Sequence, residues 1–135
     1  EPVSSLSASV KRADGQQARW WDYESPHGGF LNLEQAFADK KGNWQLSYGY
    51  AGITYNAPRA MKAKLLMDSF FLFRVYVNGK EVFSKNGENF DFPDKYAIKV
   101  NLKAGKNTIV VKATHTRVSS DIYPWGLHLR VVEAE

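Results

Sequence analysis

The sequence predicts an all-β protein, an antiparallel β-sandwich of about 8–10 strands with at most one short helix. Two observations predict this class. Apolar and polar residues alternate with a period of two through one short run after another. Asn78-Gly79 joins two such runs, and this is a strong hairpin signal because a type I′ turn needs positive φ at both central residues. An α/β fold would need helical stretches between the strands, for which the chain has almost no room.

The chain of 135 residues is long enough for one domain with a sizeable core. Residues 1–15 are weakly patterned, and we interpret them as a linker or an edge strand. Residues 16–135 would then form a single β-sandwich domain. The range Gly29–Phe37 is the one helix candidate, because Asn32 is a suitable N-cap, but a strand or an irregular loop fits these residues almost equally.

The strands follow one another between turn residues. In order, we expect them at 18–23, 44–50, 53–56, 59–67, 70–77, 80–83, 96–102, 107–113 and 125–132. The alternation assigns one side chain in two to the core. The positions predicted to face inward are Met61, Ala63, Leu65, Met67, Phe71, Phe73, Val75, Val77, Tyr96, Ile98, Val100, Leu102, Ile109, Val111, Ala113, Trp125, Leu127, Leu129 and Val131.

Composition excludes several classes of protein. The chain contains 4 Trp, 7 Tyr and 8 Phe and has a net charge of only +4, which argues against intrinsic disorder. No apolar run approaches the length of about 20 residues that spans a bilayer, so we expect no membrane partner. The absence of cysteine excludes disulfide frameworks, thiolate metal sites and thiol catalysis.

The sequence carries no motif of an enzyme or of a nucleic-acid-binding protein. His27, His115 and His128 have no metal-binding spacing, and neither a G-x-S-x-G nucleophile motif nor a Gly-rich phosphate loop is present. The basic residues are spread over the whole chain rather than gathered in one arm. We therefore expect neither catalysis nor nucleic-acid binding.

The many aromatic residues suit carbohydrate binding, because sugar rings stack on Trp and Tyr. Trp20 and Trp21 are adjacent, so on a strand their side chains point to opposite faces and one of them lies outward or under a loop. The alternative for each ring is packing in the core. One candidate site is therefore built from end loops, with Trp20, Trp21, His115, Arg117 and Tyr123 as its members.

A second candidate site is a basic sheet face. Cations occupy polar positions of several alternating strands, where they could bind an acidic polysaccharide such as a uronic-acid polymer. The members of this predicted face are Lys62, Lys64, Arg74, Tyr76, Lys99 and Lys112. The alternative is that exterior cations only prevent edge-to-edge aggregation of strands.

Two stretches, 60–83 with its R-V-Y-V-N-G-K hairpin and 96–131 with L-K-A-G-K-N-T-I-V-V-K and W-G-L-H-L-R-V, resemble a known family. They are similar to the galactose-binding-like jelly-roll modules attached to bacterial glycoside hydrolases and other secreted proteins. The resemblance covers residues 44–132. It implies a non-catalytic, secreted carbohydrate-binding module that is monomeric and attached to the catalytic domain of a larger enzyme. The other interpretation is a structural or protein-interaction domain that packs against such a catalytic domain.

The resemblance breaks down just before the hairpin, where many relatives carry S-D-D. Here Ser69 is followed by Phe70 and Phe71, with only Asp68 nearby, which argues against a calcium-dependent site at this position. We expect no other cofactor. The sequence leaves open a structural calcium ion elsewhere, for which Asp91, Asp94 or Asp121 would supply the carboxylate ligand.

Overall fold

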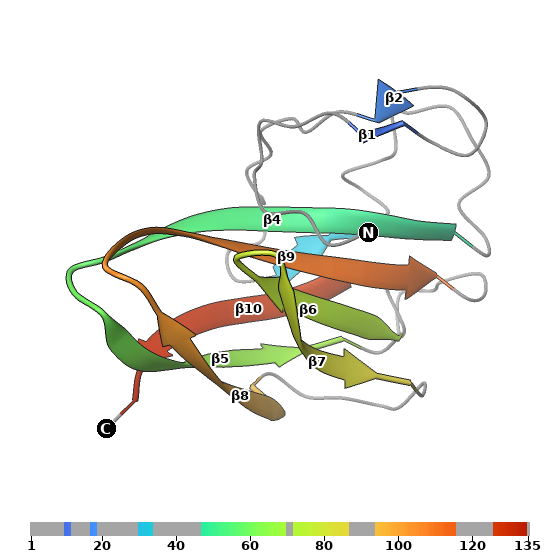
Figure 1. Ribbon diagram of the computed structural model, residues 1–135. Helices are drawn as coiled ribbons and strands as arrows, with labels where there is room; N and C mark the ends of the chain where they lie inside the picture. Colours follow the sequence, from blue (N-terminus) through green and yellow to red (C-terminus); the bar gives the residue numbers. More distant parts are fainter. Residues whose placement is uncertain are drawn as a thin grey trace.

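The structure, a computed structural model, describes residues 10–11, 17–18, 30–33, 47–69, 72–86, 94–115 and 126–134 (Figure 1). Nearly all of these residues lie in strands, and short described turns join β4 to β5, β6 to β7 and β8 to β9. The strands are β1 (Val10–Lys11), β2 (Gln17–Ala18), β3 (Phe30–Asn32), β4 (Ser47–Ala57), β5 (Met61–Asp68), β6 (Phe73–Val77), β7 (Lys80–Lys85), β8 (Tyr96–Leu102), β9 (Gly105–His115) and β10 (Gly126–Glu133).

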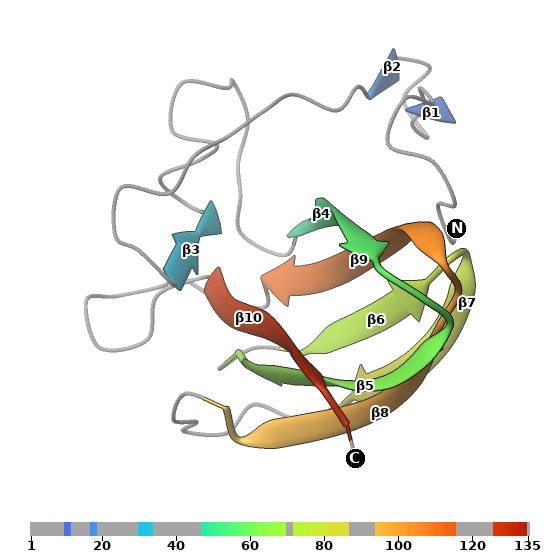
Figure 2. The ribbon, with the colours of Figure 1, turned by 90° about the vertical axis from the view of Figure 1, so that its left-hand side faces the viewer.

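Two four-stranded antiparallel sheets face each other and enclose the core (Figures 1 and 2). Sheet I has the strand order β3-β10-β5-β8, and sheet II has the order β4-β9-β6-β7. The predicted antiparallel β-sandwich is therefore confirmed, while its jelly-roll type stays a prediction. Among the described residues, β1 and β2 pair only with each other. The expected domain boundary at residue 15 and the helix that Asn32 would cap are left untested.

The turn between β6 and β7 has the expected geometry. Asn78 has a φ of 50° and Gly79 a φ of 84°, so both central residues are left-handed. The two predicted strands at 44–50 and 53–56 form one continuous strand, because Gly52 stays in the ladder opposite Val110 and does not break β4.

The core is built from the side chains that the alternation assigned to it. All seventeen predicted inward positions that the structure describes belong to the core cluster; thirteen of them are buried, and Met61, Tyr96, Leu129 and Val131 are partly exposed. Each fully buried Leu, Ile or Phe side chain contributes about 1.5–3 kcal/mol. Phe71 and Trp125 lie outside the described residues.

One buried polar side chain, Asn107, ties three chain segments together at the end of the sandwich where the turns lie. Its exposed fraction is 0%. The Asn107 Oδ1 accepts hydrogen bonds from Lys103 N at 3.1 Å and Asn78 Nδ2 at 3.0 Å. The Asn107 Nδ2 donates to the carbonyls of Lys103 and Gly105, both at 2.9 Å, and more weakly to that of Tyr55 at 3.4 Å. The amide thus fixes the β8–β9 turn against the β6–β7 turn.

Replacing Asn107 by Ala should lower the free energy of unfolding by about 2–4 kcal/mol, because the buried turn groups lose their partners. Urea unfolding of wild type and variant measures this difference. Asn101→Ala is the matched control, since Asn101 is exposed on β8 and should change stability by only about 0.5 kcal/mol. Equal unfolding midpoints for Asn107→Ala and wild type would contradict the role of this side chain.

Candidate functional site

The outer face of sheet I carries three of the predicted site residues, Lys62, Lys64 and Lys99. The inward positions of β5 and β8 are buried, so the alternate side chains of both strands point away from the core. Lys64 lies directly opposite Lys99 in the β5–β8 ladder, and Lys62 lies opposite Asn101. Residues directly opposite on antiparallel strands share a face, and Lys62 follows on the same face of β5. We call these three residues the lysine ladder.

The ladder places like charges beside each other. Directly opposed side chains on antiparallel strands have Cβ atoms about 4.5–5.5 Å apart, and two like charges at that spacing destabilise the sheet. Lys62 and Lys99 are exposed and Lys64 is half-buried. A charge arrangement that costs stability in the free protein would be relieved by a bound anion.

The carboxylates of the described residues are paired with arginine or histidine side chains and not with the ladder lysines. Arg59 pairs with Glu133, Arg74 with Glu81 at 3.1 Å, Arg130 with Asp94 at 2.6 Å, and His128 with Asp68 at 2.8 Å. Within the part of the chain that the structure describes, no carboxylate lies within ion-pair distance of a ladder ammonium group. Among the described residues, no ion pair compensates the charges of the ladder.

Two ion pairs lie farther along the outer face of sheet I. Asp68 is buried, and its carboxylate lies 2.8 Å from Nδ1 of His128 on β10. Arg130 donates through Nε and Nη2 to both oxygens of Asp94. The hydrogen bonds from Arg130 lower the pKa of Asp94, and those to Asp94 raise the pKa of Arg130. At this end of the face the guanidinium of Arg130 is paired with a carboxylate, in contrast to the ladder lysines.

The ladder face lacks aromatic rings among the described side chains. Between the ladder and the ion pairs lie Leu66, Ala97 and Val132, which share the face by register. The aromatic rings of Phe73, Phe83 and Tyr96 pack against one another inside the sandwich, with centroids 5.2–5.7 Å apart. Among the described side chains, the ladder therefore offers charge and hydrogen bonds to a ligand rather than stacking.

The prediction of a single basic face is wrong for Arg74, Tyr76 and Lys112. These three belong to β6 and β9 of sheet II, whereas the ladder belongs to sheet I. The alternation correctly predicts that these three side chains point away from the core. It does not indicate which strands belong to the same sheet. The six residues therefore lie on opposite outer faces of the sandwich.

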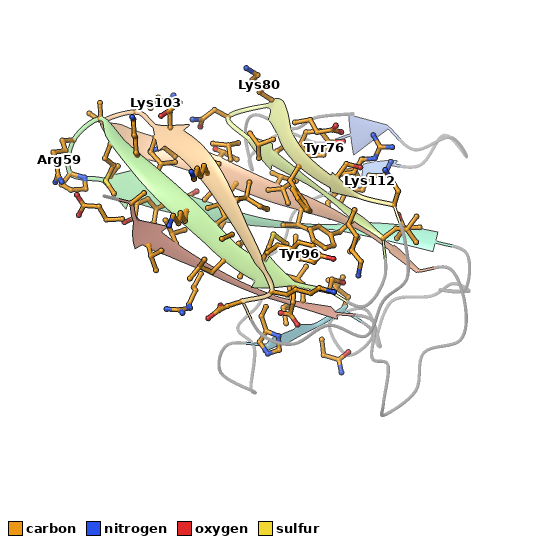
Figure 3. The ribbon with its side chains drawn as sticks, turned by 90° about the horizontal axis from the view of Figure 1, so that it is seen from below. Arg59, Tyr76, Lys80, Tyr96, Lys103 and Lys112 are labelled. Atoms are coloured by element: carbon orange, nitrogen blue, oxygen red, sulfur yellow. The ribbon has the colours of Figure 1, made fainter. Side chains whose placement is uncertain are left out.

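Tyr76 is also a buried residue and does not offer an open platform for a sugar. It is 7% exposed and packs with Val110 and Tyr50 on the outer side of sheet II. The ammonium group of Lys112 lies 5.9 Å from the Tyr50 ring centroid, and Arg74 is held by Glu81. Figure 3 shows Tyr76 and Lys112 on this part of the molecule.

The end-loop candidates are left without a structural test. Trp20, Trp21, Arg117 and Tyr123 lie outside the described residues. His115 is the last residue of β9 and pairs with Ser47 on β4 through the backbone.

The carboxylates proposed for calcium do not converge in the described residues. Both oxygens of Asp94 accept hydrogen bonds from Arg130, so Asp94 does not fit as a calcium ligand here. Asp91 and Asp121 lie outside the described part of the chain. No cluster of three or more His, Asp or Glu side chains suited to a metal occurs in the described ranges. The described residues also contain no helix long and apolar enough to span a membrane.

The structure adds three cations that the sequence did not single out. Lys80, Lys103 and Lys106 are exposed and flank the turns at the same end of the sandwich. A signal for them was present, because Lys80 follows the Asn78-Gly79 turn directly and the other two bracket the β8–β9 turn. The sequence alone does not show that these lysines lie at the same end, because the two turns are brought together by the hydrogen bonds of Asn107.

Comparisons with protein-family models, with curated proteins and with solved structures find no match to this chain. The resemblance to galactose-binding-like modules stays a prediction from the quoted motifs.

Replacing Arg130 by Gln should raise the pKa of Asp94 toward its ordinary range, because the guanidinium that stabilises the carboxylate is lost. In the wild type the lowered pKa means that this pair stabilises the fold above the pKa of the unfolded chain. That contribution is lost as the pH falls through the folded pKa. Carboxyl NMR titration of Asp94 measures the change, and Arg74→Gln is the control that should leave it unaltered. An identical titration in Arg130→Gln would contradict the assignment.

Proposed function

We propose that this chain is a non-catalytic module that binds an acidic polysaccharide through the lysine ladder of sheet I. The observation that carries the proposal is the direct opposition of Lys64 and Lys99, with Lys62 beside them and no described carboxylate within ion-pair distance. A uronic-acid polymer presents a carboxylate on each sugar. Charge-assisted hydrogen bonds from ammonium groups to those carboxylates are stronger than neutral ones.

The chemistry of the face favours an acidic over a neutral glycan. A neutral polysaccharide needs aromatic platforms for its C–H faces. The described rings are packed in the core or beside Val110, and the described side chains on the outer face of sheet I are ammonium groups, aliphatic groups and two carboxylates paired with His128 and Arg130. Its binding would weaken with salt, because exposed charges are screened.

Within a larger secreted protein, such a module would bring an attached enzyme to its polymer. A few exposed ammonium groups give weak binding at a single site. Tethering the module to a catalytic domain raises the effective concentration of the enzyme at the polymer without any new contact.

A second candidate function is a structural domain that packs against a neighbouring domain. It is favoured by Ile53, whose side chain is 43% exposed on β4, the edge strand of sheet II. In that case Lys99 would serve only to keep the edge strand β8 from pairing with other chains, and Lys62 and Lys64 on the neighbouring strand β5 would bind nothing.

Affinity electrophoresis in gels containing pectin, alginate, xylan or cellulose separates the two functions. The wild type should be retarded by pectin or alginate at low salt but not by the neutral polymers, and retardation should vanish near 0.5 M salt, at which the Debye length is only about 4 Å. The double variant Lys64→Gln/Lys99→Gln should bind about tenfold more weakly, a loss of about 1.4 kcal/mol.

The matched control is Arg74→Gln/Lys112→Gln, which removes the same charge from the opposite outer face. It should keep the wild-type retardation. Equal losses in the two double variants would show a net-charge effect and would contradict the ladder as the site. Absence of retardation by every polymer would reject the proposal in favour of the structural domain.

A further inference from the structure

The turns at one end of the sandwich gather basic residues from separate segments of the chain. The connection between β4 and β5 carries Arg59, the β6–β7 turn leads into Lys80, and Lys103 and Lys106 bracket the β8–β9 turn. Figure 3 shows Lys80 and Lys103 projecting beyond the strand ends. We call Lys80, Lys103 and Lys106 the turn-end cluster.

The backbone under this cluster is fixed by hydrogen bonds. Asn107 binds both the N–H and the carbonyl of Lys103, and its Oδ1 accepts from the side chain of Asn78. Asn78 in turn donates its N–H to the carbonyl of Thr108 at 2.8 Å and accepts from Thr108 N at 2.9 Å through its side chain. The two turns are therefore held in one arrangement before any ligand arrives, which lowers the ordering cost of binding.

The turn-end cluster is not neutralised by the described part of the chain. Arg59 is paired with Glu133, whereas no carboxylate of a described residue lies within ion-pair distance of the three lysines. All three side chains are exposed. Their summed field attracts anions and repels cations over this end of the molecule.

The cluster continues the lysine ladder. Lys103 follows the last residue of β8, four residues beyond Lys99, which corresponds to about 13 Å along an extended strand. Lys62 lies between them on the neighbouring strand, opposite Asn101. Lys80 belongs to sheet II, where it follows the β6–β7 turn. The distance from Lys103 to Lys80 is therefore about 10 Å, the usual spacing between packed sheets. The cations thus follow a path of roughly 20–25 Å.

We infer that the turn-end cluster is a second subsite for the same acidic chain, which lies along the lysine ladder and continues over the turns. The inference rests on the proposed function and specifies its ligand. The ligand is a long stretch of an unbranched polyanion, recognised by its repeated negative charges. Because the contacts are exposed ammonium groups spread along a path, affinity should depend on chain length.

Isothermal titration with oligogalacturonates of increasing length tests this subsite. For the wild type, affinity should rise with length until the oligomer spans about 20–25 Å and should then level off. The triple variant Lys80→Gln/Lys103→Gln/Lys106→Gln should bind long oligomers about tenfold more weakly and short ones with unchanged affinity. The ladder variant Lys64→Gln/Lys99→Gln should lose affinity for both.

The substitutions leave Asn78, Gly79 and Asn107 in place, so the unfolding midpoint of the triple variant should match the wild type. Equal affinity of the triple variant and wild type at every length would overturn the second subsite and leave the ladder intact. Absence of binding by the wild type at every length would reject the proposed function together with the subsite. Preferential binding of the turn end to anionic lipid vesicles or to single-stranded DNA would also overturn the inference.

Discussion

The arrangement of the turns that carry the turn-end cluster depends on the hydrogen bonds of one buried amide. Asn107 is fully enclosed and binds backbone groups on either side of the β8–β9 turn as well as the side chain of Asn78. A buried polar group costs free energy unless it is fully paired, so these partners define one geometry for the turns. The start of β9 is thereby fixed, and with it the end of β8, which Lys103 follows directly.

Two groups of described cations differ in their partners. Arg59, Arg74 and Arg130 each bind a carboxylate, and the planar guanidinium suits that pairing. The ladder and turn-end lysines have no such partner in the described ranges. Lysine ammonium groups are strongly hydrated and mobile, so they tolerate exposure and adapt to a ligand whose charges repeat along a chain. This division separates surface contacts that stabilise the fold from charges that remain available for binding.

Much of the fold could be predicted from the sequence, because a period of two directly reports which side chains face the core. Met61–Asp68 and Tyr96–Leu102 follow it closely, and the Asn78-Gly79 turn has the predicted positive φ values. The site was harder to predict. Periodicity indicates which side chains of a strand face the core, but it does not indicate to which sheet the strand belongs. Arg74 therefore lies on the outer face of sheet II, on the other side of the sandwich from the ladder. Lys85 is a second residue whose environment the sequence does not predict. It is only 6% exposed, and its ammonium group donates to the Ser69 carbonyl and lies 6.0 Å from the Phe73 ring centroid. No local pattern in the sequence predicts a buried lysine.

The central claim is that the positive outer face of sheet I binds an acidic chain. Backbone amide NMR during titration with polygalacturonate fragments tests it most directly, because it locates the contact without any substitution. The account predicts shifts concentrated on β5 and β8 around Lys62, Lys64 and Lys99, which weaken as salt is added. Shifts concentrated instead on β6 and β9, around Arg74 and Lys112, would contradict it, as would a spectrum that does not change.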